Sequence, residues 1–257
     1  MRLSLLSPLD RWRAPAPLPA RVSWLGKVAY AHRGLHGPGV PENSPAAIAA
    51  AMARGMGIEC DVQRSSDGVA MVFHDWELDR LTAASGRVRD FSSDQLGRIT
   101  LSGGNDTIPT LRQVLDQIGG RSPVLIEVKT RADRPVAALC LAVRRVLEGY
   151  LGPHAVMGFD PRVAHWFAVH SPLTLRGLVV TEENDTALAG RIRRHLWLWH
   201  ARPDFLAYDI RDLPSRFAAS QRRRGLPVLT WTVRSAEHRE RAKEHADAPI
   251  AEGPGAG

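Results

Sequence analysis

The sequence predicts an α/β fold, an irregular (β/α)8 barrel of the TIM type with a short cap insertion after the third strand. Short apolar runs alternate with helix-length segments from about residue 28 onward, and eight such runs occur before residue 234. Alternation of strand and helix is typical of parallel sheets, and one barrel of this kind commonly uses about 250 residues. The 257 residues of the chain therefore suffice for one barrel-sized domain.

The predicted strands are short apolar runs, several of them bounded by Gly, Pro or Asp. They cover residues 28–31, 57–62, 69–73, 124–128, 155–159, 175–180, 205–210 and 227–233. Only residues 63–68 separate the second run from the third, which is too short for a crossover helix. Either these two strands are antiparallel or the barrel is irregular at this place.

Segments with a 3.6-residue apolar period lie between most of these strands. The first of them has Ser44 as its predicted N-cap and Pro45 in its first turn. The predicted helices cover residues 44–54, 110–118, 135–147, 161–169, 186–199, 214–224 and 236–245. They supply the crossover connections that parallel strands require.

The domain organisation follows from these elements. Residues 1–26 are rich in proline with little periodicity, which predicts an N-terminal arm. The barrel covers residues 27–252, and residues 76–122 form an insertion within it. Because an insertion after the carboxyl end of a strand lies over the mouth of a barrel, we expect a small cap there. Residues 253–257 are expected to be a flexible tail.

Composition narrows the class of protein. The two cysteines, Cys60 and Cys140, cannot form a disulfide framework for a chain of this length, and no Cys/His cluster has the spacing of a zinc site. No apolar run approaches the roughly 18 residues that span a bilayer, and Pro8 interrupts the apolar N-terminus before signal-peptide length. We expect a cytoplasmic, unprocessed protein.

The charge of the chain is basic, with 34 Lys and Arg against 27 Asp and Glu, and the excess lies in the last third. Such a field attracts anionic substrates, lipid surfaces or nucleic acid alike. No nucleic-acid motif with interleaved aromatic residues is present, so we expect no nucleic-acid partner. The oligomeric state stays open.

Ionisable residues end four consecutive predicted strands. His32 and Arg33 follow the first, and His74 and Asp75 follow the third. The second strand carries Glu59 and Asp61, and the fourth carries Glu127 and Lys129. Residues i and i+2 of a strand share a face, so both pairs are expected to point inward and to converge, while Cys60 points away.

This set of groups predicts phosphoryl-transfer chemistry. Three converging carboxylates need a positive counter-charge, and all-oxygen ligation favours one Mg²⁺ or Ca²⁺. His32 and His74 could act as general acid and base, and Arg33 and Lys129 could hold anionic oxygens. Each feature alone also has a structural interpretation, such as a hydrogen-bonded histidine or a plain ion pair. Their coincidence at the same ends of successive strands favours a site.

The motifs around these residues resemble the glycerophosphodiester phosphodiesterase family. The match is dense from residue 28 to about residue 130 and returns at Thr230. The matching motifs are His32-Arg33-Gly34, Pro41-Glu42-Asn43-Ser44, Glu59-x-Asp61-Val62, Asp67-Gly68, Val72-Phe73-His74-Asp75, Leu78-Asp79-Arg80-x-Thr82, Ile108-Pro109-Thr110-Leu111, Glu127-Val128-Lys129 and Thr230-Trp231-Thr232-Val233.

The resemblance implies metal-dependent hydrolysis of a glycerophosphodiester to glycerol 3-phosphate and an alcohol, in glycerol and lipid metabolism. It implies His32 and His74 as the acid/base pair. It implies Glu59, Asp61 and Glu127 as metal ligands, with Arg33 and Lys129 on the phosphate. Glu42 either contacts the substrate or orders the loop after the first strand, and Trp231 is either an apolar wall beside the glycerol or a core aromatic residue.

The chain departs from the family pattern near its end. Where members usually have a strand resembling Gly-x-Asp-Gly-Ile-Ile-Thr-Asp-x-Pro, residues 246–254 read Ala-Asp-Ala-Pro-Ile-Ala-Glu-Gly-Pro. Pro249 removes a backbone donor there, which puts a regular last strand in question.

Two other functions remain open at this stage. One is a lysophospholipase D- or phospholipase C-like lipid phosphodiesterase, aided by weak contact of tryptophans and basic residues with a membrane surface. The other is a catalytically silent barrel that binds phosphodiesters. Retention of both histidines and all three carboxylates favours the enzyme.

Overall fold

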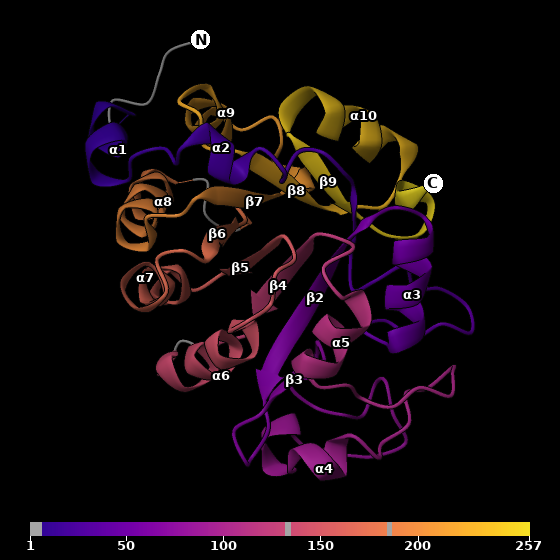
Figure 1. The fold of residues 1–257 in the computed structure, drawn as a ribbon. Helices are drawn as coiled ribbons and strands as arrows, with labels where there is room; N and C mark the ends of the chain where they lie inside the picture. Colours follow the sequence, from indigo (N-terminus) through magenta and orange to yellow (C-terminus); the bar gives the residue numbers. More distant parts are fainter. Residues whose placement is uncertain (1–6, 132–134, 184–186) are drawn as a thin grey trace. The chain divides into compact units, whose positions relative to one another are not determined.

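The computed structural model describes residues 7–131, 135–183 and 187–257. The chain divides into two compact units, residues 30–154 and residues 1–29 with 155–257. Figure 1 labels the elements of both units.

All eight predicted strand segments form strands, and a ninth follows them near the C-terminus. The strands are β1 Tyr30–Ala31, β2 Gly57–Arg64, β3 Ala70–Val72, β4 Val124–Val128, β5 His154–Gly158, β6 Leu175–Val180, β7 Phe205–Asp209, β8 Val228–Val233 and β9 Ala248–Ala251.

The predicted helices also form, with ends that differ from the prediction by a few residues. The helices are α1 Ser7–Arg13, α2 Pro19–Val22, α3 Pro45–Ala53, α4 Ser93–Leu96, α5 Leu111–Ile118, α6 Ala137–Leu147, α7 Pro161–His170, α8 Leu188–Ala201, α9 Arg216–Arg223 and α10 Ala236–His245, with short 3-10 turns at Val88–Asp90, Ile210–Asp212 and Gly253–Ala256. Ser44 caps α3 as expected, because its side chain accepts a hydrogen bond from the Ala47 amide.

The unit of residues 30–154 is built around β2, the long purple strand in Figure 1. β1 and β4 pair with β2 in parallel, and β3 pairs with it antiparallel. The short connection between β2 and β3 is therefore an antiparallel one, which is the first of the two arrangements that its length allows. Asp61 is level with Glu127 in the β2–β4 register, so the carboxylates of these two strands lie side by side.

The segment between β3 and α5, predicted as a cap, has little regular structure. It contains one 3-10 turn, the short helix α4 and isolated bridges such as Glu77 with Arg87 and Thr82 with Leu101. Its residues nevertheless share a small apolar core with β3. That core consists of Met71, Phe73, Leu78, Val88, Leu96, Leu101 and Ile108.

The other unit contains five neighbouring parallel strands, β5 to β9. The last of them forms despite Pro249, which lies opposite Thr230 of β8. The register between β8 and β9 shifts after this pair and resumes at Val233 with Ala251. This strand was not among those predicted. Because β3 is antiparallel, β9 brings the number of parallel strands to eight.

The N-terminal segment, predicted as an arm, contains α1 and α2 and is anchored by one buried carboxylate. Asp10 is fully buried and accepts hydrogen bonds from His195 Nδ1, Trp199 Nε1 and Gln221 Nε2, each at 2.8 Å. Burial alone would raise the pKa of Asp10. These three donors lower the pKa by more than burial raises it, so the net pKa is below its ordinary value. α1 is thus tied to α8 and α9 by polar contacts in an apolar setting.

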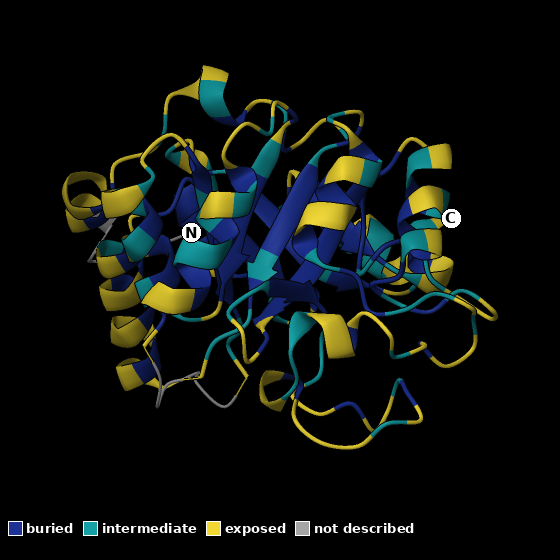
Figure 2. Cartoon of the chain, turned by 60° about the horizontal axis from the view of Figure 1, so that its bottom comes forward, coloured by how far each residue is buried: buried dark blue, intermediate teal, exposed yellow. Residues whose placement is uncertain are grey.

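Burial follows the expected pattern within each unit. Strands are almost wholly buried, while helices show exposed outer faces (Figure 2). No helix in the described part of the chain is long and apolar enough to cross a membrane.

Candidate active site

Three carboxylates gather along the middle of β2 and near the carboxyl end of β4. Oxygen atoms of Glu59, Asp61 and Glu127 all lie within 4.8 Å of one another. Glu59 and Asp61 are 1% and 2% exposed, and the Glu127 side chain is 12% exposed. The i, i+2 spacing on β2 and the register with β4 place them together, as the sequence predicts.

The electrostatics of these carboxylates show a shortage of positive charge. Burial, together with repulsion from Asp61 and Glu127, raises the pKa of Glu59 well above its ordinary value. Burial also raises the pKa of Glu127, and Lys129 only partly opposes this. A divalent cation among the three oxygens would reverse both shifts. The donor set, carboxylates alone, fits a hard cation such as Mg²⁺ or Ca²⁺.

Asp61 behaves differently because cationic groups surround it. Burial alone would raise its pKa. The charges of Lys129, His74 and Arg33 lower the pKa by more than burial raises it, so the net pKa is below the ordinary value. Arg33 Nε lies 3.3 Å from Asp61 Oδ2, and Lys129 Nζ lies 3.5 Å from Asp61 Oδ1 and 3.3 Å from Glu127 Oε1. Asp61 is therefore the member of the group that stays ionised most readily.

The loop after β1 has an unusual backbone. Arg33 has φ 56°, Gly34 φ 76° and Asn43 φ 58°, and left-handed conformations of non-glycine residues cost free energy. A Cβ at Gly34 would lie 2.8 Å from the carbonyl carbon of Ala47, so only glycine fits there. This conformation allows the Arg33 amide to donate to Glu59 Oε2 at 2.9 Å.

Asn43 is a functional candidate to which the sequence assigned no role. Its Nδ2 donates to Asp61 Oδ2 at 3.0 Å, and the Asp61 amide donates to Asn43 Oδ1 at 3.3 Å. Its own amide donates to the Arg33 carbonyl at 2.8 Å. Asn43 therefore fixes the orientation of Asp61, and its presence in the Pro41–Ser44 motif was the available signal.

A chain of ion pairs joins the loops after β1 and β3. Glu42 Oε1 accepts from Arg33 Nη1 at 2.8 Å and from Arg80 Nη2 at 2.7 Å. Arg80 also donates to both carboxylate oxygens of Asp75, and Asp75 Oδ1 lies 2.7 Å from His74 Nδ1. Glu42 thus holds the guanidinium groups of Arg33 and Arg80 in place. The sequence analysis did not identify Arg80 or the role of Asp75.

His74 is the better defined of the two candidate histidines. Burial lowers its pKa; Asp61 and Asp75 raise it, and Lys129 and Arg33 lower it, with a net value below the ordinary one. Burial therefore favours the neutral form of this imidazole. Gln63 Nε2 donates to the carbonyls of Phe73, His74 and Asp75 and so holds this segment against β2.

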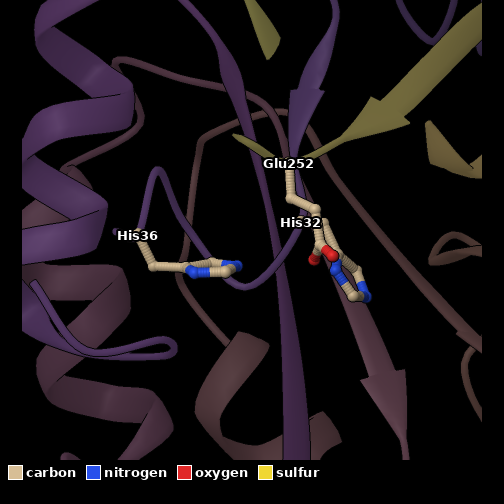
Figure 3. A group of neighbouring side chains, drawn as sticks. All are labelled: His32, His36 and Glu252. Carbon is tan, nitrogen blue, oxygen red and sulfur yellow. The ribbon is translucent and has the colours of Figure 1, made fainter. Parts of the chain in front are cut away.

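His32 directly follows β1, where Ala31 is level with Ile58 in the register with β2. Its successor Arg33 reaches Glu59 through its amide, which places His32 beside the carboxylate end of β2. His32 is 9% exposed. Figure 3 shows it with His36 on the segment after β1; Glu252, also drawn there, belongs to the other unit.

Eight of the nine predicted site residues lie in the unit of residues 30–154, and Trp231 lies in the other. Within its own unit Trp231 is partly buried on β8. Its Nε1 donates to the Ala207 carbonyl at 2.9 Å, and its ring meets that of Phe159 edge-on at 5.4 Å.

The strand and helix order and the buried carboxylate group define a class, the α/β barrel proteins with an acidic site at the strand ends. Residues 32–250 match the Glycerophosphoryl diester phosphodiesterase family, and the chain belongs to this family.

The similarity to individual proteins agrees with this family assignment. The chain is 38% identical over 217 residues to YhdW of Bacillus subtilis, whose name gives this activity provisionally; the match covers 79% of this chain and 84% of that protein. It is also 38% identical over 109 residues to a glycerophosphodiester phosphodiesterase of Bacillus altitudinis, covering 40% of this chain and 44% of that one. The match thus spans less than half of the length of that relative.

Solved structures share the fold. A phosphodiesterase of Oleispira antarctica, in complex with sn-glycerol-3-phosphate, matches with a TM-score of 0.78 at 22% identity over 90% of this chain and 94% of that one. A glycerophosphodiester phosphodiesterase of Thermotoga maritima matches with a TM-score of 0.71 at 24% identity over 87% and 93% of the two chains. The predicted fold class, an irregular (β/α)8 barrel, is confirmed.

Proposed function

We propose that this protein is a metal-dependent glycerophosphodiester phosphodiesterase that releases glycerol 3-phosphate and an alcohol. The observation that carries the proposal is the group of three carboxylates, with Glu59 and Asp61 buried and Glu127 partly buried, and with two cationic side chains and the His74 imidazole beside it. Family membership supports it, as does the glycerol 3-phosphate complex of the Oleispira antarctica protein.

The three carboxylates would hold one divalent cation, Mg²⁺ or Ca²⁺. When bound, the cation supplies the missing positive charge and polarises a phosphoryl oxygen. Arg33 and Lys129 lie against these carboxylates, at 3.3 Å from Asp61 and Glu127 respectively. Both would bind the remaining phosphate oxygens, the guanidinium through its fork and the ammonium as a point charge.

The two histidines would move the protons. One imidazole takes a proton from the nucleophile, either a water molecule or the neighbouring glycerol hydroxyl, and the other gives a proton to the leaving alcohol oxygen. Attack by the hydroxyl forms a cyclic phosphate, which a water molecule then opens to give glycerol 3-phosphate. His74 suits proton acceptance because burial favours its neutral form, and Asp75 fixes its Nδ1 so that Nε2 can act. His32, at the end of β1, would serve the opposite oxygen. Trp231 would form the apolar wall beside the glycerol.

Glu42 would act on the substrate through Arg33. It accepts hydrogen bonds from Arg33 and Arg80, so it presents the Arg33 guanidinium at a fixed position. We therefore place Glu42 as a positioning residue of the phosphate site.

The test is release of glycerol 3-phosphate from glycerophosphodiesters and lysophospholipids, with chelator and with Mg²⁺ or Ca²⁺ restored. We expect turnover of the diesters that chelator abolishes and metal restores. His74→Ala should reduce kcat about 10²- to 10⁴-fold, whereas the control His170→Ala, an exposed residue in the last turn of α7, should not. Preference for lysophospholipids would identify the lipid phosphodiesterase. Absence of turnover from every substrate would indicate the silent barrel.

A further inference from the structure

A pocket of about 340 Å³ adjoins the candidate active site within the unit of residues 30–154. Lys129 and Gln63 line it, and so does Trp76, which directly follows His74 and Asp75. Lys129 also contacts Glu127 and Asp61, so one side chain borders both spaces. The volume lies within the range of ligand sites and exceeds what a three-carbon glycerol fills.

The charges around this pocket are unevenly distributed. Four arginines, Arg64, Arg87, Arg89 and Arg131, line it together with Lys129, and Glu77 is the one carboxylate among the described residues of the wall. The arginines come from the end of β2, the segment after β3 and the residues after β4. Such a wall has a positive potential that attracts anions and repels cations.

Trp76 does not offset the preference of this pocket for anions over cations. Its side chain is 38% exposed, and an exposed indole face is a common binding surface for ammonium groups. Here the Arg131 guanidinium lies 5.9 Å from the Trp76 ring centroid. A cationic alcohol such as choline would have to compete with this guanidinium for the ring.

We infer that this pocket receives the leaving alcohol of the substrate and selects alcohols that carry negative charge. The inference rests on the proposed function. In this arrangement Arg33, Lys129 and the cation hold the scissile phosphate. Arg87 and its neighbours contact the part of the diester beyond that phosphate.

The experiment compares three diesters that differ in the charge of the leaving alcohol. They are bis(glycerophospho)glycerol, whose leaving alcohol bears a second phosphodiester, glycerophosphoglycerol, whose leaving alcohol is neutral, and glycerophosphocholine, whose leaving alcohol is cationic. We expect kcat/KM to decrease in that order at low salt, and the difference to shrink as ionic strength rises.

Charge reversal at the pocket provides the sharper readout. Arg87→Glu should lower kcat/KM for the anionic alcohol about fivefold and raise it for choline by a similar factor. Structural damage would lower both. Arg98→Glu makes the same change of net charge at an exposed residue that follows α4 and does not line the pocket, so it should leave the ratio of the two values near that of the parent.

The possible failures are distinguishable. If none of the three diesters is hydrolysed, the proposed function fails and the alcohol subsite fails with it. If they are hydrolysed with equal kcat/KM, or if Arg87→Glu and Arg98→Glu change the ratio alike, the catalytic assignment stands and the anionic subsite is wrong.

Discussion

Asp75→Asn tests how the site orients its histidine. Asp75 Oδ1 lies 2.7 Å from His74 Nδ1, and asparagine has the same shape without the charge. A hydrogen bond to a charged group contributes about 1.5–3 kcal/mol, and about 1.4 kcal/mol corresponds to a factor of ten. If the bond is lost in the transition state, kcat/KM should fall about 10- to 150-fold.

The pH profile provides an independent readout of the same substitution. Asp75 raises the pKa of His74 through their hydrogen bond, so its replacement should lower that pKa. The limb of the kcat/KM profile that belongs to His74 should therefore move to lower pH, whether His74 acts as acid or base. The pKa of Asp75 itself is about 2, since hydrogen bonds from Arg80 and His74 outweigh the effect of burial. It stays ionised across the assay range.

The assay is steady-state hydrolysis of a glycerophosphodiester from pH 5 to 9 with metal saturating. Asp94→Asn, an exposed carboxylate in the first turn of α4, is the matched control and should behave as the parent. A value of kcat/KM within about threefold of the parent for Asp75→Asn, with an unmoved limb, would refute the orienting role.

Three further predictions concern other parts of the molecule. Arg33→Ala should mainly raise KM in steady-state assays and lower kcat much less than His74→Ala does, because a phosphate contact that acts in the ground state and the transition state alike contributes uniform binding. The Cys60 thiol is fully buried and its pKa is raised by burial, so thiol reagents should label it at least about a thousandfold more slowly in the folded protein than in denaturant; fast labelling would show that the β2 register is wrong. Asp10→Ala leaves three donors without their acceptor and should lower the free energy of unfolding at pH 7 by about 3 kcal/mol in urea titrations. Because the folded pKa of Asp10 is lowered, its contribution is present above the ordinary carboxyl pKa and is lost as pH falls through the folded value; an unchanged midpoint for Asp10→Ala would contradict this.

Local sequence rules account for most of the fold. The N-caps of α3 and α10, Ser44 and Ser235, lie next to these helices in the sequence, so the bounds of both could be predicted to within a residue or two. β9 could not be predicted, since Pro249 lacks a ladder donor and the strand depends on its pairing with β8. The helix α1 was missed because its stability depends on tertiary contacts of Asp10.

In the candidate site, too, local sequence features could be predicted and contacts between distant segments could not. Glu59 and Asp61 could be placed on one face from their spacing, and Glu127 from its neighbouring strand. The links from Glu42 through Arg80 to Asp75 join separate loops. No periodicity within one element predicts such contacts, because only the folded chain brings these loops together.

The most direct test of the account is calorimetric titration of the protein with Mg²⁺ and with Ca²⁺, paired with activity at each metal concentration. We predict one bound cation per chain, half-maximal activity at its Kd, and a loss of affinity of more than about tenfold in Glu59→Gln. Glu237→Gln, an exposed residue of α10, should bind as the parent does. Metal binding by Glu59→Gln equal to that of the parent, or full activity in chelator, would contradict the assignment of these carboxylates.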